Sequence, residues 1–468
     1  MVFSSSIFIF LFLPTVLLAY YLLRPWRIAQ NIILVITSLF FYAWGEPKIV
    51  FLMILSIIVN YVFGLLVDRF RKSKIRAYAT IILMLSYNLG ILFVFKYLNF
   101  VASNIGLTLN YEISLPIGIS FYTFQAISYV IDVYRKKGEP QKNPLNVALY
   151  IAFFPQLIAG PIVRYETIAY QIKYRKETLD NFTCGVKRFI QGLGKKLILA
   201  NSFAPIADFS FGHINELSVI SAWIGIICYT MQIYFDFSGY SDMAIGLGKM
   251  FGFEFQENFD YPYMSKSITE FWRRWHISLG TWFRDYVYIP LGGSRVKNKS
   301  RLVFNLFVVW TLTGIWHGAN WTFLVWGLWY FILLTFEKLS GILKKEKTRI
   351  ETVFSHIFTM FGVMFGWVIF RAETLNVAFL YLQKMFFSTY GFMDNLACFL
   401  LNDSLFLIII GGLFCTPFWD KIIFKLGVTK KHNWALEICS VLGHIALFLL
   451  CIGYAINSSY NPFIYFNF

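Results

Sequence analysis

Charged residues are scarce in this chain. Asp, Glu, Lys and Arg make up 14% of its 468 residues, whereas hydrophobic residues make up 58%. A soluble protein could not cover its surface with so few charged side chains, so the soluble globular class is excluded. Apolar runs that are long enough to cross a bilayer recur along the whole length. The composition therefore predicts an all-α polytopic membrane protein.

Acidic residues are fewer than basic ones, which leaves a formal net charge of +16. The basic residues lie in short clusters between apolar runs, which is the pattern of loops beside anionic lipid, so we expect membrane lipid and no nucleic acid as a partner. The six cysteines lack the pairing of a disulfide framework or a zinc site. No metal is predicted.

Familiar catalytic motifs of soluble enzymes are absent from the sequence. It contains no HExxH, no Walker loop and no nucleophile elbow of the G-x-S-x-G type. It also shows no repeat and no low-complexity linker, so residues 1–468 are predicted to form a single membrane domain. Any chemistry must then come from polar groups in apolar surroundings.

The order of the helices can be predicted from hydropathy and charge. Basic clusters follow the first, third and fifth apolar runs, which predicts an N-terminus outside and regular crossing of the first five spans. The first run is expected to be retained as a span, and the C-terminus is expected outside. We predict roughly 11 spanning helices. The apolar runs lie at about residues 6–23, 28–44, 49–67, 78–98, 114–132, 146–163, 218–237, 302–316, 320–337, 351–370, 403–418 and 433–456.

Two stretches depart from this regular order. Residues 146–163 are flanked by basic residues on both sides and contain Pro155, Gly160 and Pro161, which predicts a broken, re-entrant segment. Residues 254–301 are aromatic and charged and contain no span, which predicts helices at the cytoplasmic interface.

His317 is the most informative single residue. It stands between two apolar runs, with basic clusters before the first and after the second, at Arg295–Arg301 and Lys338–Lys347. The arm from Leu302 to Trp316 would rise roughly 22 Å as a helix, against about 30 Å for the hydrocarbon core. His317 is therefore expected inside the membrane, where an ionisable group is by default functional. Its small neighbours suggest that a substrate could approach it.

Other polar residues have both functional and structural interpretations. Asn320 could orient the ring of His317. His276 follows Arg273 and Arg274 and is either functional or an interfacial histidine. Asp236 is either buried or at the interface; if it is buried, it needs a partner, which the Arg-rich stretch could supply.

At these positions the chain resembles the membrane-bound O-acyltransferase (MBOAT) family, most closely its bacterial branch of alginate O-acetyltransferase membrane subunits. The resemblance covers essentially the whole chain. The matching stretches are Phe154–Arg164, Tyr234–Asp242, Asn258–Tyr263, Phe271–Leu279, Phe283–Gly293, Gly314–Trp321 and the tail Ser459–Phe468.

The resemblance implies a ring of tilted helices around a central tunnel and an acyltransferase of the bacterial cytoplasmic (inner) membrane. An acetyl group would pass from a cytoplasmic thioester donor, acetyl-CoA or another acyl thioester, across the membrane to O-acetylate an exported, alginate-type polysaccharide. A secreted or membrane-anchored SGNH-type acetyltransferase would be the partner, with an acyl carrier protein as a further candidate, and no cofactor would be bound permanently. His317 and His276 would be catalytic. Residues expected to contact substrate are Asn320, Trp316, Arg273, Arg274, Asp236 and Arg164.

Alternatives stay open at this point. The chain could instead be a D-alanyl transfer protein of teichoic acid modification, which uses a carrier-protein thioester, or a transporter with His317 and Asp236 as a proton relay. His317 could act as a general base or as the site of a transient acyl-histidine.

Overall fold

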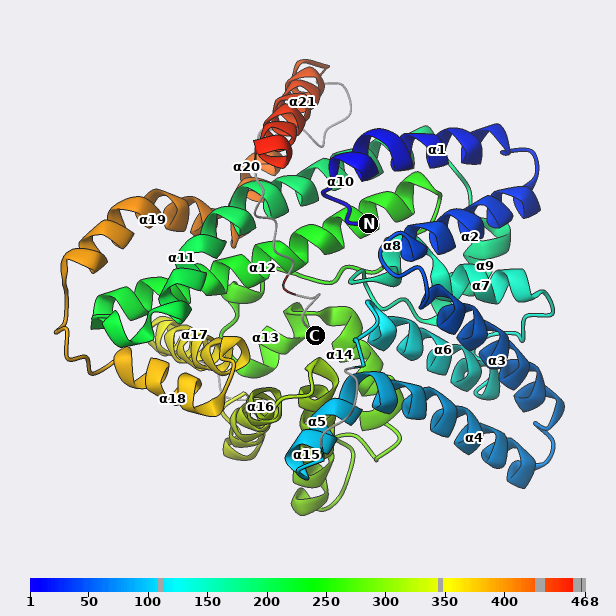
Figure 1. Ribbon diagram of the computed structural model, residues 1–468, viewed down its shortest axis with the longest axis horizontal. Coiled ribbons are helices and arrows are strands. Elements are labelled where there is room, and N and C mark those ends of the chain that lie inside the picture. The colour runs from blue at the N-terminus through cyan, green and yellow to red at the C-terminus, as the bar shows by residue number, and fades with distance from the viewer. Residues whose placement is uncertain (108–112, 344–347, 426–433, 458–463, 465–468) are drawn as a thin grey trace. The chain divides into compact units, whose positions relative to one another are not determined.

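The computed structural model describes residues 1–107, 113–343, 348–425, 434–457 and 464. Every regular element among these residues is a helix (Figure 1), which confirms the all-α fold class. Part of the basic cluster, Lys344–Lys347, and nearly all of the tail stretch Ser459–Phe468 lie outside the described residues.

Seven helices in the described part of the chain are long and apolar enough to cross a membrane. Two shorter apolar helices, Phe8–Leu22 and Arg27–Ala43, coincide with the first two predicted spans. The expected total of roughly 11 stays a prediction. The seven are α3 (Val50–Arg69), the helix that runs from α4 through α5 (Lys74–Asn104), α12 (Val219–Met250), α16 (Trp321–Ser340), α17 (Arg349–Arg371), α19 (Asn395–Phe414) and Trp434–Ile456 within α21 (Trp434–Asn457).

The chain divides into two compact units. The first comprises Met1–Ile190 and Tyr240–Gln256, and the second comprises Gln191–Gly239 and Glu257–Phe468. That residues 1–468 act as one domain stays a prediction. The remaining α-helices are α1 (Leu13–Leu22), α2 (Arg27–Ala43), α6 (Ile119–Tyr134), α7 (Pro144–Ala152), α8 (Phe154–Leu157), α9 (Tyr165–Tyr174), α10 (Leu179–Gly194), α11 (Asn201–Gly212), α13 (Ile268–Arg274), α14 (Ile277–Phe283), α15 (Lys299–His317), α18 (Leu375–Lys384) and α20 (Phe418–Lys425). Short 3-10 or π segments are η1 (Phe8–Phe12), η2 (Phe93–Tyr97), η3 (Lys195–Ala200), η4 (Ile214–Glu216), η5 (Pro262–Met264) and η6 (Arg284–Tyr288).

In the first unit, α3, α4 and α6 pack against one another (Figure 1). Gly64 of α3 makes the approach to α6 possible, because a Cβ there would lie 2.5 Å from the ring of Tyr129. Asn60 of α3 and Asn88 of α4 are buried and exchange two side-chain hydrogen bonds of 3.1 and 2.8 Å. This reciprocal pair satisfies both amides and fixes the register of the two helices.

The break predicted within 146–163 is confirmed. Helix α7 ends at Ala152, α8 is a single short turn, and no helix follows until α9. The broken backbone finds partners inside the protein: the Phe154 N–H donates to Ser38 Oγ (3.1 Å), and the Tyr150 hydroxyl donates to the Val163 carbonyl (2.9 Å). Non-helical backbone at membrane depth requires such hydrogen-bond partners within the protein. The re-entrant topology itself stays a prediction.

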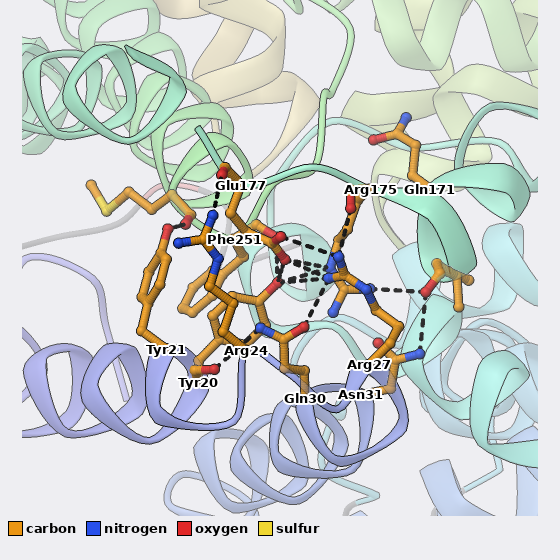
Figure 2. A network of polar contacts seen from close by, with 12 residues as sticks. Tyr20, Tyr21, Arg24, Arg27, Gln30, Asn31, Gln171, Arg175, Glu177 and Phe251 are labelled. Carbon is orange, nitrogen blue, oxygen red and sulfur yellow. Dashed lines mark hydrogen bonds and ion pairs between the residues drawn. The ribbon is translucent and has the colours of Figure 1, made fainter. Parts of the chain in front are cut away.

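A polar network joins α1 and α2 to the end of α12 (Figure 2). Arg27 pairs with Glu177 and donates to the Arg175 carbonyl (2.6 Å). Arg175, whose side chain is fully buried, donates to the Tyr20 hydroxyl (2.9 Å), and Tyr20 donates to the Phe251 carbonyl (2.9 Å). A guanidinium held this deeply must be paired, so these contacts fix the two N-terminal helices in the first unit.

In the second unit, α15 and α16 form a helical hairpin that places His317 at its turn (Figure 1). Two glycines allow the helices to touch. A Cβ at Gly327 would lie 2.4 Å from the Trp310 carbonyl oxygen, and one at Gly314 would lie 2.5 Å from that of Phe323. Small residues at such crossings let helix backbones approach closely. Helix α17 packs on α16, and α18 packs on α17.

This crossing predicts a large cost for one added methyl group. Gly327→Ala should lower the free energy of unfolding by about 1–3 kcal/mol, because the methyl group would overlap the α15 backbone. The matched control is Gly412→Ala in α19, where a Cβ would meet nothing within 4 Å. Thermal unfolding of the two detergent-purified variants provides the comparison. Equal unfolding temperatures would show that the hairpin is not tightly packed at Gly327.

Candidate functional site

His317 is the last residue of α15 and is only 4% exposed. Aromatic rings enclose its imidazole, with centroid separations of 4.9 Å to Trp316, 4.7 Å to Trp326 and 5.2 Å to Phe370. These side chains come from α15, α16 and α17, so the packing of three helices determines where the imidazole lies. The site is therefore a buried, aromatic environment around one ionisable group.

The small residues beside His317 have a packing explanation. A Cβ at Gly318 would lie 2.3 Å from the ring of Phe323, and Gly314 lies at the α15–α16 crossing. The sequence suggested that these residues leave room for a substrate. The contacts show instead that they make room for Phe323 and for α16.

Asn320 caps the next helix. Its Oδ1 accepts from the Thr322 N–H (3.1 Å), and its Nδ2 donates to the Glu373 carbonyl (2.8 Å). Asn is a favoured N-cap residue because its side chain satisfies a free N–H of the first turn. Asn320 therefore shapes the turn that carries His317, and its direct action on the imidazole stays a prediction.

His276 lies between α13 and α14 and is 2% exposed. Its backbone is left-handed, with φ 46° and ψ 52°, a conformation that costs a non-glycine residue free energy and often marks a functional site. Nδ1 lies 3.1 Å from Asn258 Oδ1, and the ring meets that of Phe237 at 4.7 Å. Burial lowers the pKa of His276 to about 3. The imidazole is thus neutral at physiological pH.

Trp316 brings the two histidines into one neighbourhood. Its ring centroid lies 4.9 Å from that of His317 and 6.1 Å from that of His276. Two imidazoles separated by 41 positions in the chain therefore share one aromatic neighbour. This arrangement brings two imidazole side chains to one buried location.

Asp236 is buried in α12, and its partner differs from the one expected. Lys196 Nζ lies 2.6 Å from Asp236 Oδ1, and the Ile464 N–H donates to Oδ2 (2.8 Å). The carboxylate is therefore paired with a lysine of η3, and not with an arginine of 273–284. Phe237, the next residue, contacts His276, so Asp236 adjoins the wall of the site.

The three predicted arginines have different surroundings. Arg274 pairs with Glu270 and Asp260, at 3.0 Å each, whereas Arg273 on the same helix is exposed. Both arginines lie shortly before His276 in the chain, with Trp275 between Arg274 and the histidine. Arg164 belongs to the first unit, where it pairs with Glu166 at 2.8 Å.

Two residues near the site escaped the sequence analysis. Lys196 lies in Gly194-Lys-Lys-Leu-Ile-Leu199, where nothing marks it as the partner of a carboxylate 40 positions later. Asn258 begins one of the stretches that carry the family resemblance, but no sequence pattern gave its side chain a role. Within the described ranges, no three His, Cys, Asp or Glu side chains are grouped so as to hold a metal ion.

Comparison with known proteins agrees with the resemblance read from the sequence. The model of the MBOAT, membrane-bound O-acyltransferase family, matches residues 141–379. The probable alginate O-acetylase AlgI of Azotobacter vinelandii is 45% identical over 403 residues, which cover 84% of this chain and 79% of that protein. The peptidoglycan O-acetyltransferase of Helicobacter pylori is 34% identical over 525 aligned positions, which cover 100% of this chain and 98% of that protein. The teichoic acid D-alanyltransferase of Bacillus subtilis is 31% identical over 56% of this chain and 69% of its own length.

The Lys196–Asp236 pair gives a prediction for stability. Lys196→Met should destabilise the protein by about 3–5 kcal/mol, because it leaves a buried carboxylate without its counter-charge. The double variant Lys196→Met/Asp236→Asn should recover most of this loss, since neither side chain is then charged and the introduced amide oxygen can still accept from the Ile464 N–H. Thermal unfolding of both variants in detergent tests this. Equal destabilisation of the single and double variants would contradict the pairing.

Proposed function

Because the chain belongs to the membrane-bound O-acyltransferase family, we propose that it moves an acetyl group from a cytoplasmic thioester donor across the membrane for O-acetylation of an exported or cell-surface polysaccharide. That it is an acyltransferase follows from the family and from relatives named as acetyltransferases. The observation that carries the finer proposal is the pair of buried imidazoles beside Trp316.

In this proposal His317 is the general base. It takes the proton of the acceptor hydroxyl as that oxygen attacks the thioester carbonyl; the C–O bond forms, the C–S bond breaks, and the thiolate leaves and is protonated. Proton transfer by a positioned side chain contributes about 10²–10⁴ in rate. A transient acyl-histidine on His317, resolved by the acceptor hydroxyl, is the competing route.

His276 and its neighbours serve the donor in this proposal. The buried neutral imidazole has a ring nitrogen that can hydrogen-bond to the substrates. Arg273, three residues before His276, is exposed, and guanidinium groups suit phosphate recognition. Arg274, which is paired with Glu270 and Asp260, is proposed to hold the chain beside Arg273 in place. We also propose that Arg164 and Asp236 contact substrate.

The donor and the partner follow from the same chemistry. Coenzyme A and a phosphopantetheine arm both carry phosphate, which cannot enter hydrocarbon without a large cost, so the donor approaches from water. We propose acetyl-CoA or another acyl thioester from the cytoplasm, the inner membrane of a bacterium as the location, and a secreted or anchored SGNH-type acetyltransferase as the protein that modifies the polysaccharide.

D-alanyl transfer is the second candidate, supported by the similarity to a teichoic acid D-alanyltransferase. The two functions differ in the donor. The purified protein, reconstituted in liposomes, should release thiol from acetyl-CoA with labelled acetyl when an acceptor saccharide is present. Turnover with D-alanyl carrier protein alone would favour the second candidate. The family and the transferase names of the relatives favour acyl transfer over a transporter with a proton relay through His317 and Asp236.

The proposal makes His317 indispensable. His317→Ala should reduce acyl transfer by about 10²-fold or more, since it removes the base while aromatic rings still enclose the site. The control is His213→Ala, which changes an exposed histidine at the end of α11 and should leave the rate unchanged. Both are compared by labelled acetyl transfer in liposomes, with monodispersity in detergent as the folding check. Near wild-type transfer by a folded His317→Ala protein would exclude a catalytic role.

A further inference from the structure

The side chain of Asn258 is fully buried beside His276. Its Oδ1 accepts from the backbone N–H of Ser278 (3.2 Å) and from the Ser278 hydroxyl (2.9 Å), and it lies 3.1 Å from His276 Nδ1. The backbone carbonyl of Asn258 also accepts from the Ile277 N–H (2.9 Å). Asn258 therefore binds the turn that carries His276 through both its backbone and its side chain, and three groups converge on its Oδ1.

The orientation of this amide follows from its neighbours. A backbone N–H can only donate, so the atom of Asn258 that faces Ser278 N must be the oxygen and not the NH₂ group. The Ser278 hydroxyl has one hydrogen, which points to this oxygen at 2.9 Å rather than to His276 Nδ1 at 3.5 Å. Towards the imidazole, this oxygen can therefore act only as a hydrogen-bond acceptor.

The tautomer of His276 follows in turn. A contact of 3.1 Å between an amide oxygen and Nδ1 is favourable only if Nδ1 carries the hydrogen. The ring is neutral, so it carries one hydrogen and not two. Nε2 is then left with its lone pair, which makes it the hydrogen-bond acceptor of the ring.

Two features of this contact cost free energy of folding. Asn258 Nδ2 is buried and makes no hydrogen bond to any residue that the structure describes, although a buried donor without a partner is destabilising. His276 has a left-handed backbone, which is also unfavourable for a residue with a side chain. A turn selected only for stability would avoid both costs. Such costs are typical of a group held in place for chemistry.

We propose that Asn258 is a positioning residue for acyl transfer: it holds His276 in the Nδ1–H tautomer and so presents Nε2 to accept a hydrogen from an O–H, N–H or S–H group of the substrates. This assignment rests on the proposed function, since it gives His276 a part in that reaction. Asn258 acts through His276 and does not itself touch the reacting atoms.

Two variants of Asn258 separate positioning from packing. Asn258→Leu removes the acceptor oxygen at similar volume, and kcat should fall about 10- to 100-fold with little change in KM, the range seen when the orienting partner of a metal-bound imidazole is lost. Asn258→Asp keeps an acceptor and adds a negative charge beside the ring, which raises the pKa of His276. Because the protonated ring has no lone pair, the acidic limb of the pH–rate profile should move to higher pH, with activity recovered above it.

The matched control is Ser278→Ala, which removes one donor to the same oxygen but leaves the amide and the imidazole in place. It should keep nearly wild-type activity and an unshifted pH profile. Two results would overturn the proposal. One is an equal loss of kcat in the Leu and Asp variants with an unshifted acidic limb, which would make Asn258 a packing residue. The other is an unchanged kcat in Asn258→Leu. If the Leu variant does not fold, the acidic limb of the Asp variant decides.

A second readout does not need activity. In protein labelled with [15N]histidine, the His276 signals, assigned by their loss in His276→Gln, should show a protonated Nδ1 in the wild type and lose this preference in Asn258→Leu. A wild-type ring protonated at Nε2 would overturn the proposal. If the tautomer behaves as expected but no acyl donor is consumed, the proposed function fails while the positioning of His276 by Asn258 stands.

Discussion

Polar side chains buried in this protein must find their partners within the chain, because neither lipid nor a packed aromatic interior supplies the hydrogen bonds that water would. The Lys196–Asp236 pair in the second unit and the Arg27–Glu177 pair in the first meet this requirement by joining distant segments. Apolar helices alone could slide or rotate against one another at little cost. The buried pairs remove this freedom, and the glycines at helix crossings then let the backbones close.

The same constraint shapes the candidate site. Aromatic rings enclose His317, and burial lowers the pKa of His276, which keeps its ring neutral at physiological pH. A neutral imidazole can accept a hydrogen bond at its unprotonated nitrogen, and a closed site strengthens such a contact. Trp316 lies against both rings, so a change in its position would affect both histidines together. The site therefore depends on packing as much as on its two ionisable groups.

The sequence predicts much of this arrangement, for identifiable reasons. Composition and long apolar runs require helices, and the prolines of 146–163 require a break there. The apolar arms before and after His317 predict the hairpin α15–α16, although the glycines near His317 proved to serve its packing. Charge clusters also showed which stretches could not be spans.

The partners of the polar groups could not be predicted. Lys196 meets Asp236, and Asn258 meets His276, only because separate helices fold against each other. Hydropathy gives the period of each helix but not its neighbours, and an arginine-rich stretch nearby in sequence was a plausible but incorrect partner for Asp236. The left-handed backbone of His276 likewise depends on the turn that Asn258 binds, which no local preference of histidine would indicate.

The central claim is that both histidines belong to one acyl-transfer site. A structure of the protein with a non-hydrolysable acetyl thioester analogue bound tests it most directly. The account predicts the analogue's carbonyl carbon within reacting reach of the acceptor position beside His317, with contacts of about 3–3.5 Å, and a polar group of the ligand bound to Nε2 of His276. An analogue seated elsewhere, with no contact to either imidazole, would contradict it.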